Sequence, residues 1–291
     1  MRVIAAVLAV FAALAAGALS GAAVAKPPIW VAHGPRSTLV MFGSVHLLPA
    51  GLDWEPAALA AALTRADQLW FELPIDQATD REAARLAGLR GAYPAGDRLA
   101  NHLTADQRAR LARVARSLSL APAALDRMRP WLAEVTVSLA ADEQAGAMAS
   151  TGVEQQVQGA APASAVRRAL ETARQQIGFL AGAAAADQVA SLDETLHEIE
   201  ERPRAYGQAV AEWMAGDLAG LDADALEPLR RTSPTLYARL ITHRNEHWAQ
   251  VLGRRLARPG VTVVIVGVGH MVGPAGVPAL LRAKGFAVEG P

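Results

Sequence analysis

The pattern of apolar and polar positions changes twice along the chain. Short apolar runs rich in β-branched residues lie near both ends, and a long stretch of helical periodicity separates them. Such short runs, bounded by Gly and Pro, are typical of buried strands. The predicted strands cover residues 29–32, 37–45, 69–74, 261–268 and 286–289, with a further short strand at 165–172 that charged residues interrupt. The first two flank a Gly-Pro turn and predict a hairpin.

The middle of the chain, from about residue 76 to residue 260, has a helical pattern. Thr104 and Gln107 form a capping box, and Pro130 and Pro234 stand at first-turn positions of two other helices. The predicted helices cover residues 55–66, 104–118, 130–147, 194–214 with a break at Pro203, 234–256 and 274–284. The expected fold is therefore α/β (α+β). One domain over residues 26–291 has a mixed β-sheet core from both chain ends and a large helical block between them.

Two of the predicted strands end in a glycine that is followed, three residues later, by a histidine. Gly43 precedes His46 in this way, and Gly267 precedes His270 more than 200 residues further along. Strand ends and the loops after them carry the chemistry of many α/β proteins. The repeated G-x-x-H pattern predicts two histidines at one rim of one sheet. The alternative is that each is an ordinary, partly buried residue.

Glu72 interrupts the apolar run of the strand at 69–74. A carboxylate flanked by aromatic and aliphatic side chains is costly to bury without a partner. A metal ion or a nearby cation would account for it, as would a position at a solvated strand end. Beside the two strand-end histidines, the functional interpretation predicts a site formed by His46, Glu72 and His270.

Composition narrows the classes of function. The chain has 291 residues, and its 28 Lys and Arg balance its 28 Asp and Glu. No basic stripe stands out, so nucleic acid is not an expected partner. The absence of cysteine excludes disulfides, Cys-ligated zinc and a Cys nucleophile. Histidine and carboxylate are then the strongest candidate metal ligands.

The first 25 residues have the pattern of a secretory signal peptide. Arg2 precedes an apolar run that reaches about Leu19, and Ala23-Val24-Ala25 stands before a Pro-rich segment. We expect cleavage before Lys26, export to the periplasm or the medium, and no stable membrane anchor afterwards. The alternative is a retained anchor, for which the apolar run is short.

A glycine-rich segment after the strand at 261–268 offers one alternative function. Gly267, Gly269 and Gly273 approach a dinucleotide-binding fingerprint. The third glycine comes one position late, however, and His270 occupies the turn. The segment therefore does not predict a nucleotide cofactor.

Residues 243–247 offer a second alternative. They read H-x-x-E-H, the inverted zinc-protease motif, and place both histidines on one face of a helix. The preferred interpretation is that this helix presents Arg244 and Asn245 to the site and keeps Trp248 in the core.

Taken together in order and spacing, these segments resemble the TraB/GumN family, which includes the GumN-like exported proteins and the Tiki metalloproteases. The resemblance rests on residues 42–49, 69–72, 152–154, 170–176, 213–217, 244–248, 266–273 and 285–288. It implies a mixed sheet with helices and an active site built from the two G-x-x-H histidines and the strand glutamate. It also implies divalent-metal-dependent peptide hydrolysis, as in the Tiki branch; other members are tied to pheromone shutdown. This chain departs from the family in carrying Glu154 where Asp is usual, and in a shortened stretch before Leu170.

The residues and the family resemblance together predict an exported, metal-dependent hydrolase whose expected substrates are peptides. His46 and His270 would be ligands of a divalent metal ion (Mn, Co or Zn) or transition-state stabilisers, and Glu72 would be a metal ligand or the general base for a metal-bound water. Arg244 and Asn245 would polarise the scissile carbonyl or hold the substrate, and Glu171 is a further candidate. The alternative is a non-catalytic protein that sequesters a peptide or other small ligand in the same cleft.

Overall fold

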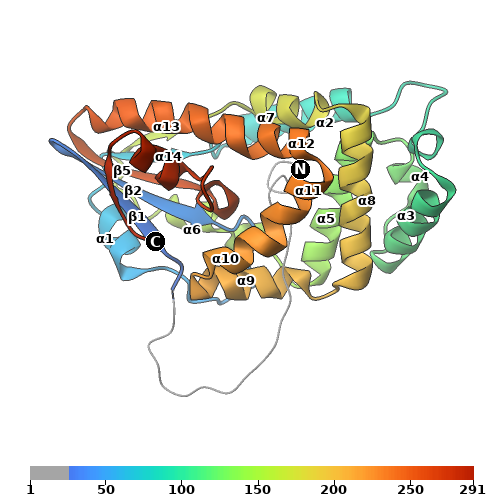
Figure 1. The fold of residues 1–291 in the computed structure, drawn as a ribbon, viewed down its shortest axis with the longest axis horizontal. Helices are drawn as coiled ribbons and strands as arrows, with labels where there is room; N and C mark the ends of the chain where they lie inside the picture. The colour runs from blue at the N-terminus through green and yellow to red at the C-terminus, as the bar shows by residue number, and fades with distance from the viewer. Residues whose placement is uncertain (1–25) are drawn as a thin grey trace, which may run out of the picture.

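The computed structural model describes residues 26–291 and is built on a six-stranded mixed sheet (Figure 1). The predicted signal peptide, residues 1–25, lies outside the described residues, and the predicted first residue after cleavage, Lys26, is the first residue described. The order of the strands is β4-β3-β5-β2-β1-β6. Their bounds are β1 Ile29–Gly34, β2 Ser37–Ser44, β3 Gln68–Phe71, β4 Val166–Ala169, β5 Gly260–Gly267 and β6 Ala287–Glu289. The mixed sheet built from both chain ends confirms the predicted fold class.

Strands β4, β3, β5 and β2 are neighbours in the sheet and run parallel to one another. β2 pairs with β5 with Ser44 opposite Gly267, and β3 lies between β5 and β4. β1 is antiparallel to both of its neighbours, β2 and β6, and forms the predicted hairpin with β2. The carboxyl ends of β2, β3, β4 and β5 therefore meet at one edge of the sheet, which we call the carboxyl edge. In α/β proteins, ligands bind at this edge.

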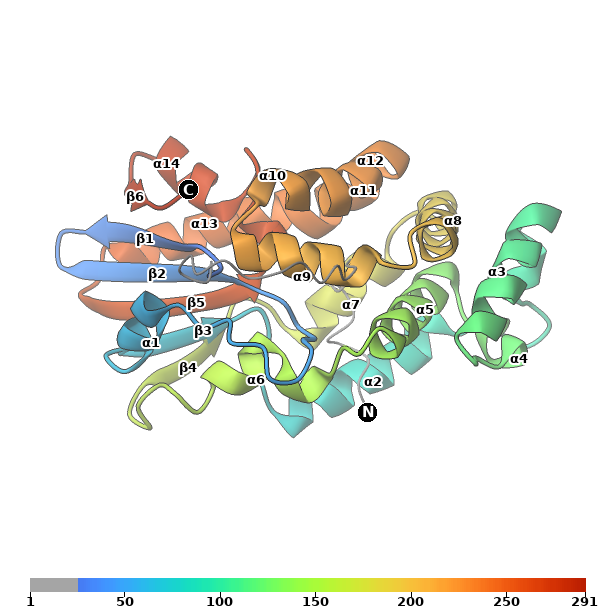
Figure 2. The same ribbon diagram turned by 90° about the horizontal axis from the view of Figure 1, so that it is seen from below.

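Both faces of the sheet are covered, so its central strands are apolar along nearly their whole length. On one face, Met41 and Val264 pack with Trp248 and Leu252 of α13. On the other, alternate residues such as Phe42 pack in a cluster that includes side chains of α1 and α9. Figure 2 shows β1 and β2 between α13 and α14 on one side and α1 on the other.

The helical block lies beyond one end of the sheet, as Figure 1 shows. The α-helices are α1 Ala57–Leu63, α2 Gln77–Gly91, α3 Ala105–Ser117, α4 Pro122–Leu125, α5 Pro130–Gln144, α6 Val153–Val157, α7 Ala173–Ala181, α8 Ala185–Glu201, α9 Ala205–Ala215, α10 Leu218–Leu221, α11 Glu227–Thr232, α12 Pro234–Tyr237, α13 His243–Leu256 and α14 Val277–Ala283. The 3-10 helices are η2 Leu99–His102, η3 Ala149–Thr151 and η6 Val268–His270. The π-helices are η4 Asp222–Leu226 and η5 Ala238–Thr242. No helix within residues 26–291 has the length and apolar character to cross a membrane.

Capping residues and prolines in the sequence predicted where several helices begin. Thr104 and Gln107 form the predicted capping box before α3, and Pro130 opens α5. The break at Pro203 separates α8 from α9, although α8 begins nine residues before the predicted start at 194. The helix predicted over 234–256 is a helical run in the structure, in which the π-helix η5 lies between α12 and α13. The Leu240 carbonyl, within η5, accepts a hydrogen bond from the Arg244 side chain.

Candidate active site

Each of the four parallel strands delivers a polar side chain to the carboxyl edge. His46 follows β2, Glu72 follows β3, Glu171 follows β4, and His270 ends η6 directly after β5. Parallel register, rather than sequence proximity, brings them together. Arg244 reaches the same place from α13. The residues proposed from sequence therefore gather in one part of the molecule.

Arg244 is the centre of this cluster, although only 2% of it is exposed. Its Nε donates to Glu171 Oε1 at 2.8 Å, and its Nη2 donates to Glu171 Oε2 at 2.9 Å. Its other Nη2 bond goes to Glu72 at 2.7 Å, and Nη1 donates to the Leu240 carbonyl at 2.9 Å and to His270 Nε2 at 3.0 Å. These contacts use all five N–H groups of the guanidinium. A buried arginine is stable when its charge is paired and its donors are satisfied in this way.

Glu72 is held as a carboxylate. It accepts hydrogen bonds from the backbone N–H of Gly267 at 2.8 Å and from the side chains of Arg244 and Gln176 at 2.7 and 2.9 Å. Burial alone would raise its pKa, but the charge of Arg244 and these hydrogen bonds hold the pKa at about 2. For Glu171, burial raises the pKa and Arg244 opposes the rise. The cation that the sequence argument required near Glu72 is Arg244.

His270 is fixed as one neutral tautomer. Arg244 can only donate, so His270 Nε2 accepts, and Nδ1 must carry the proton that it donates to Asn245 Oδ1 at 2.5 Å. The amide of Asn245 is oriented by its donation to the Ala275 carbonyl at 2.8 Å. Burial and the neighbouring guanidinium lower the pKa of His270 to about 3. Trp248 lies against its ring, with the centroids 4.4 Å apart.

His46 has different surroundings. Its Nδ1 lies 2.8 Å from Glu154 Oε1, and Ser44 donates to that same oxygen. Burial would lower the pKa of His46, but Glu154 outweighs it and raises the pKa to about 9. No side chain or backbone group of residues 26–291 forms a hydrogen bond with His46 Nε2. His46 is therefore the member of the cluster with a ring nitrogen available to a ligand.

Glu154 is the partner that the sequence argument did not assign. The resemblance drew attention to residues 152–154, but nothing in the sequence pairs them with His46. In the structure, the Val153 N–H donates to the Val45 carbonyl, which docks α6 against the loop after β2. A Cβ on Gly152 would lie 2.0 Å from the His46 carbonyl oxygen, so only glycine permits this approach. Docking through Gly152 places the Glu154 carboxylate on the imidazole.

The close approach at Gly152 predicts the effect of Gly152→Ala. The added methyl group must push α6 away from the His46 loop, at a cost of about 1–3 kcal/mol. As Glu154 withdraws, the pKa of His46 should fall from about 9 towards its ordinary value. Denaturant unfolding and an NMR titration of the imidazole measure the two effects. Gly159→Ala is the matched control, since nothing lies within 4 Å of its added Cβ. Unchanged His46 titration in Gly152→Ala would contradict this account of the docking.

Comparison with known proteins identifies the family to which the chain belongs. A family model, described as the TraB/PrgY/gumN family, matches residues 28–290. The chain belongs to this family. It is also similar to YbaP of Escherichia coli (strain K12), with 25% identity over 243 residues, which cover 83% of this chain and 87% of YbaP. YbaP of Shigella flexneri matches to the same extent. Both are described as uncharacterized proteins. No solved structure matches the chain.

The metal expected from the resemblance to TraB/GumN proteins would need His46, Glu72 and His270 as ligands. Within residues 26–291, no group of three or more His, Asp or Glu side chains is placed to hold a metal ion. His270 Nε2 and one oxygen of Glu72 already accept hydrogen bonds from Arg244. A permanent positive charge thus bridges two of the three expected ligands, and the residues in this arrangement do not fit a metal ion. Metal binding stays a prediction for direct measurement.

The residues of α13 that form the H-x-x-E-H motif lie in a different environment from their neighbours Arg244, Asn245 and Trp248. His243, Glu246 and His247 are exposed, whereas Arg244, Asn245 and Trp248 of the same helix are buried. The H-x-x-E-H motif in this member of the TraB/PrgY/gumN family therefore faces away from the carboxyl edge. The expected placement of Arg244 and Asn245 towards the site, with Trp248 in the core, matches the structure. Their expected role on a substrate carbonyl stays a prediction; in this arrangement all the donors of Arg244 are engaged within the protein.

Proposed function

We propose that the protein is an exported hydrolase that acts on peptides, with His46 and Glu154 as its acid–base pair at the carboxyl edge. Family membership supports the comparison with the Tiki branch, and residues 1–25 have the composition of a signal peptide. The observation that carries the proposal is the contrast within the cluster. Arg244, Asn245 and Glu72 are committed to one another or to the backbone, while His46 keeps Nε2 available beside a carboxylate.

The chemistry follows the usual logic of an imidazole oriented by a carboxylate. Glu154 accepts the proton on Nδ1 and so directs the Nε2 lone pair of the neutral ring outward. In that form His46 takes a proton from an attacking water, and Glu154 stabilises the imidazolium that results. The imidazolium then returns its proton to the leaving amine. Arg244 and His270 act as positioning residues, because they hold Glu72 and the strand ends in place.

The predicted metal is a separate part of this proposal. If Mn²⁺, Co²⁺ or Zn²⁺ binds at His46, Glu72 and His270, it would act as a Lewis acid on the substrate carbonyl. Binding would require Arg244 to release His270 Nε2 and Glu72. The geometry of the described residues therefore favours hydrolysis that depends on His46 without a resident ion.

The alternative function is a protein that sequesters a peptide or other small ligand without turnover. One observation favours it. Glu72, which was expected to be a ligand or general base, has both oxygens engaged and a pKa held at about 2, so it is a weak proton acceptor. On this alternative, the cluster is a rigid support for a ligand-binding surface and His46 is a binding residue.

Metal content and peptide cleavage test the proposal together. The purified protein should cleave members of a peptide library, and treatment with EDTA should leave the rate within about twofold, because no metal-bound water is required. Because the pKa of His46 is raised to about 9, its unprotonated fraction grows about tenfold per pH unit below that value. The value of kcat/KM should rise accordingly between pH 6 and pH 9.

The other outcomes of this experiment are equally definite. Loss of activity with EDTA and its return with Mn²⁺, Co²⁺ or Zn²⁺ would establish the metal and require Arg244 to move. An absence of cleavage with and without these ions, together with retained peptide binding, would establish the sequestering alternative.

A further inference from the structure

A cavity of about 150 Å³ lies between the carboxyl edge and the helical block. Ser44 and Val45 at the end of β2, and Val268 and Gly269 of η6, form its wall on the side of the sheet. Side chains from the helical block form the rest, contributed by α5, α7, α8, α9, α10, α11, α12, η4 and η5. An apolar cavity of this volume accommodates a molecule about as large as benzene.

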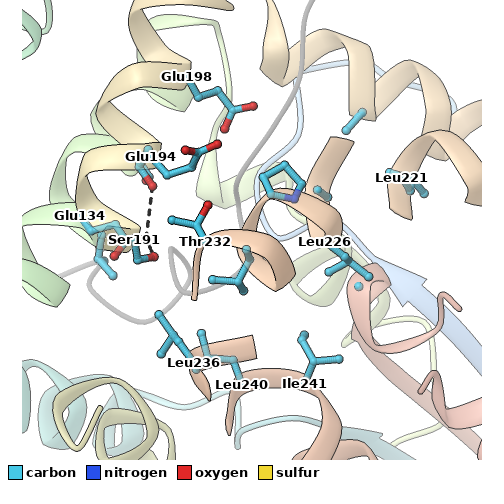
Figure 3. Close-up of a pocket in the computed structure, with 18 of the residues that line it drawn as sticks. Glu134, Ser191, Glu194, Glu198, Leu221, Leu226, Thr232, Leu236, Leu240 and Ile241 are labelled. Atoms are coloured by element: carbon cyan, nitrogen blue, oxygen red, sulfur yellow. Dashed lines mark hydrogen bonds between the residues drawn. The ribbon is translucent and has the colours of Figure 1, made fainter. Parts of the chain in front are cut away.

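The two sides of the cavity differ in chemistry, as Figure 3 shows. One side is aliphatic and is formed by Leu221, Leu226, Leu236, Leu240 and Ile241. The opposite side carries carboxylates and a hydroxyl from α5 and α8, namely Glu134, Ser191, Glu194 and Glu198. None of the described residues that line the cavity is Lys, Arg or His. The cavity therefore presents an apolar wall and an acidic end without a cation between them.

Glu134 differs from the other two carboxylates of the cavity in having no cationic partner among the described residues. Its Oε1 accepts hydrogen bonds from Ser191 at 2.7 Å and Thr195 at 3.2 Å, and no Lys, Arg or His of the described part of the chain forms an ion pair with it. Glu194 and Glu198, by contrast, lie 3.4 Å from Arg231 and Arg202, which are not among the lining residues. Burial raises the pKa of Glu134 to about 7 and that of Glu198 to about 8.

Buried polar atoms without partners form a second, independent indication of a ligand. Ser138 lines the cavity and is 5% exposed, and its Oγ has no hydrogen-bond partner within residues 26–291. The indole Nε1 of Trp131, which lines the same cavity, is also unsatisfied. Buried polar groups in folded proteins are normally satisfied. Both residues belong to α5, the helix that also carries Glu134.

We propose that this cavity binds a compact apolar molecule that carries one ammonium group. The ammonium pairs with the Glu134 carboxylate at the acidic end, where Ser191 and Thr195 orient that carboxylate, and the apolar body packs against the leucines and Ile241. Charge complementarity selects a cation, since the lining is acidic and the described lining residues include no basic side chain. Ser44 is shared between this cavity and the surroundings of Glu154, but neither His46 nor Glu154 lines the cavity, and binding there does not require turnover.

Two sources supply this chemistry: a free small amine, and the amino-terminal residue of a peptide with a leucine-like side chain. Isothermal titration of the purified protein with 2-phenylethylamine and with 2-phenylethanol tests the shared chemistry, since the two molecules differ only in the cationic group. The amine should bind about tenfold or more tightly than the alcohol, because a charge-assisted hydrogen bond replaces a neutral one. A second pair, Leu-Gly-Gly amide and its N-acetyl form, separates the sources: a preference for the free amino terminus selects the peptide.

Glu134→Gln should remove the preference for the amine, because it keeps the shape of the side chain and loses its charge. Glu201→Gln, at an exposed position of α8 outside the cavity lining, is the matched control and should retain the preference. Equal affinities of the unaltered protein for the amine and the alcohol would overturn the proposal without any variant. So would a preference that survives in Glu134→Gln. Neither outcome depends on whether peptides are cleaved.

Discussion

Replacing Arg244 with methionine is expected to remove about 3–5 kcal/mol of folding free energy. The change leaves Glu72, Glu171 and the Nε2 atom of His270 without their shared donor. Because domains are typically stable by only about 5–15 kcal/mol, this is a large fraction of the total. Urea unfolding followed by circular dichroism measures it. Arg254→Met, on the exposed face of the same helix, should change stability by less than about 0.5 kcal/mol.

The pH dependence of this variant distinguishes a lost ion pair from a lost packing contact. In the unaltered protein, the pKa of Glu72 is depressed to about 2, so its contribution is present above the unfolded pKa of about 4.3 and is lost as the pH falls towards 2. Without Arg244, burial dominates and the pKa values of Glu72 and Glu171 should rise above that unfolded value. The variant should then be most stable at low pH and lose stability as the pH increases. A uniform loss at every pH would contradict the ion-pair account.

Arg244→Lys separates charge from geometry. A lysine restores one positive charge but cannot reproduce five donors arranged in a plane. We expect an intermediate stability and a partial return of the normal pH dependence. Full stability in the lysine variant would mean that the charge alone holds the carboxylates, and that the hydrogen bonds to His270 and Leu240 add little.

The position of the site could be predicted because it depends on strand periodicity and parallel pairing. The apolar runs that end in Gly43 and Gly267 became β2 and β5, which pair in register along their whole length. Gly43 lies opposite Val266 and Gly267 opposite Ser44, so the two glycines are one register position apart. Two histidines at the same offset from these glycines therefore arrive at one edge. The need for a partner near Glu72 could also be predicted, since a carboxylate among aromatic residues is costly to bury alone. The sequence argument left that partner open between a metal ion and a cation, and Arg244 fills the role here.

The roles of individual residues in the site could not be predicted as reliably. Whether Arg244 reaches a substrate depends on how many of its donors the protein itself uses, and four of the five acceptors come from segments far from it in sequence. The π-helix η5, which exposes the fifth acceptor at Leu240, is invisible to a pattern of 3.6 residues per turn. These facts arise from tertiary packing.

Glu154 escaped assignment for a related reason. A short helix of five residues has little periodicity to indicate which way it faces. Its contact with His46 depends on a backbone approach that only Gly152 allows. A glycine directly before a helix is common, and the sequence alone does not show that this one touches a loop more than 100 residues earlier.

Replacing His46 with alanine is expected to lower kcat/KM for peptide cleavage by about 10²–10⁴-fold, the usual contribution of a general base. The fold should persist, because His46 is not among the hydrogen-bond partners of Arg244 and its main partner is Glu154. His247→Ala is the matched control: this histidine is exposed on α13, so its removal should leave activity nearly unchanged. The inverted zinc motif predicts the opposite pair of results. Metal analysis of each variant shows whether His46 acts through a bound ion.

Glu154→Gln tests the acid–base role of His46 without removing the imidazole. The amide oxygen can still accept the Nδ1 proton, but the negative charge that raises the pKa of His46 to about 9 is gone. Burial is then the largest remaining influence on the ring and lowers its pKa. The midpoint of the pH–kcat/KM profile should therefore move down by about two or more units, as the loss of a close opposite charge implies. A binding role for His46 would change KM and leave this midpoint in place. An active His46→Ala variant, or a Glu154→Gln profile that does not move, would show that the protons in the reaction are carried by another group.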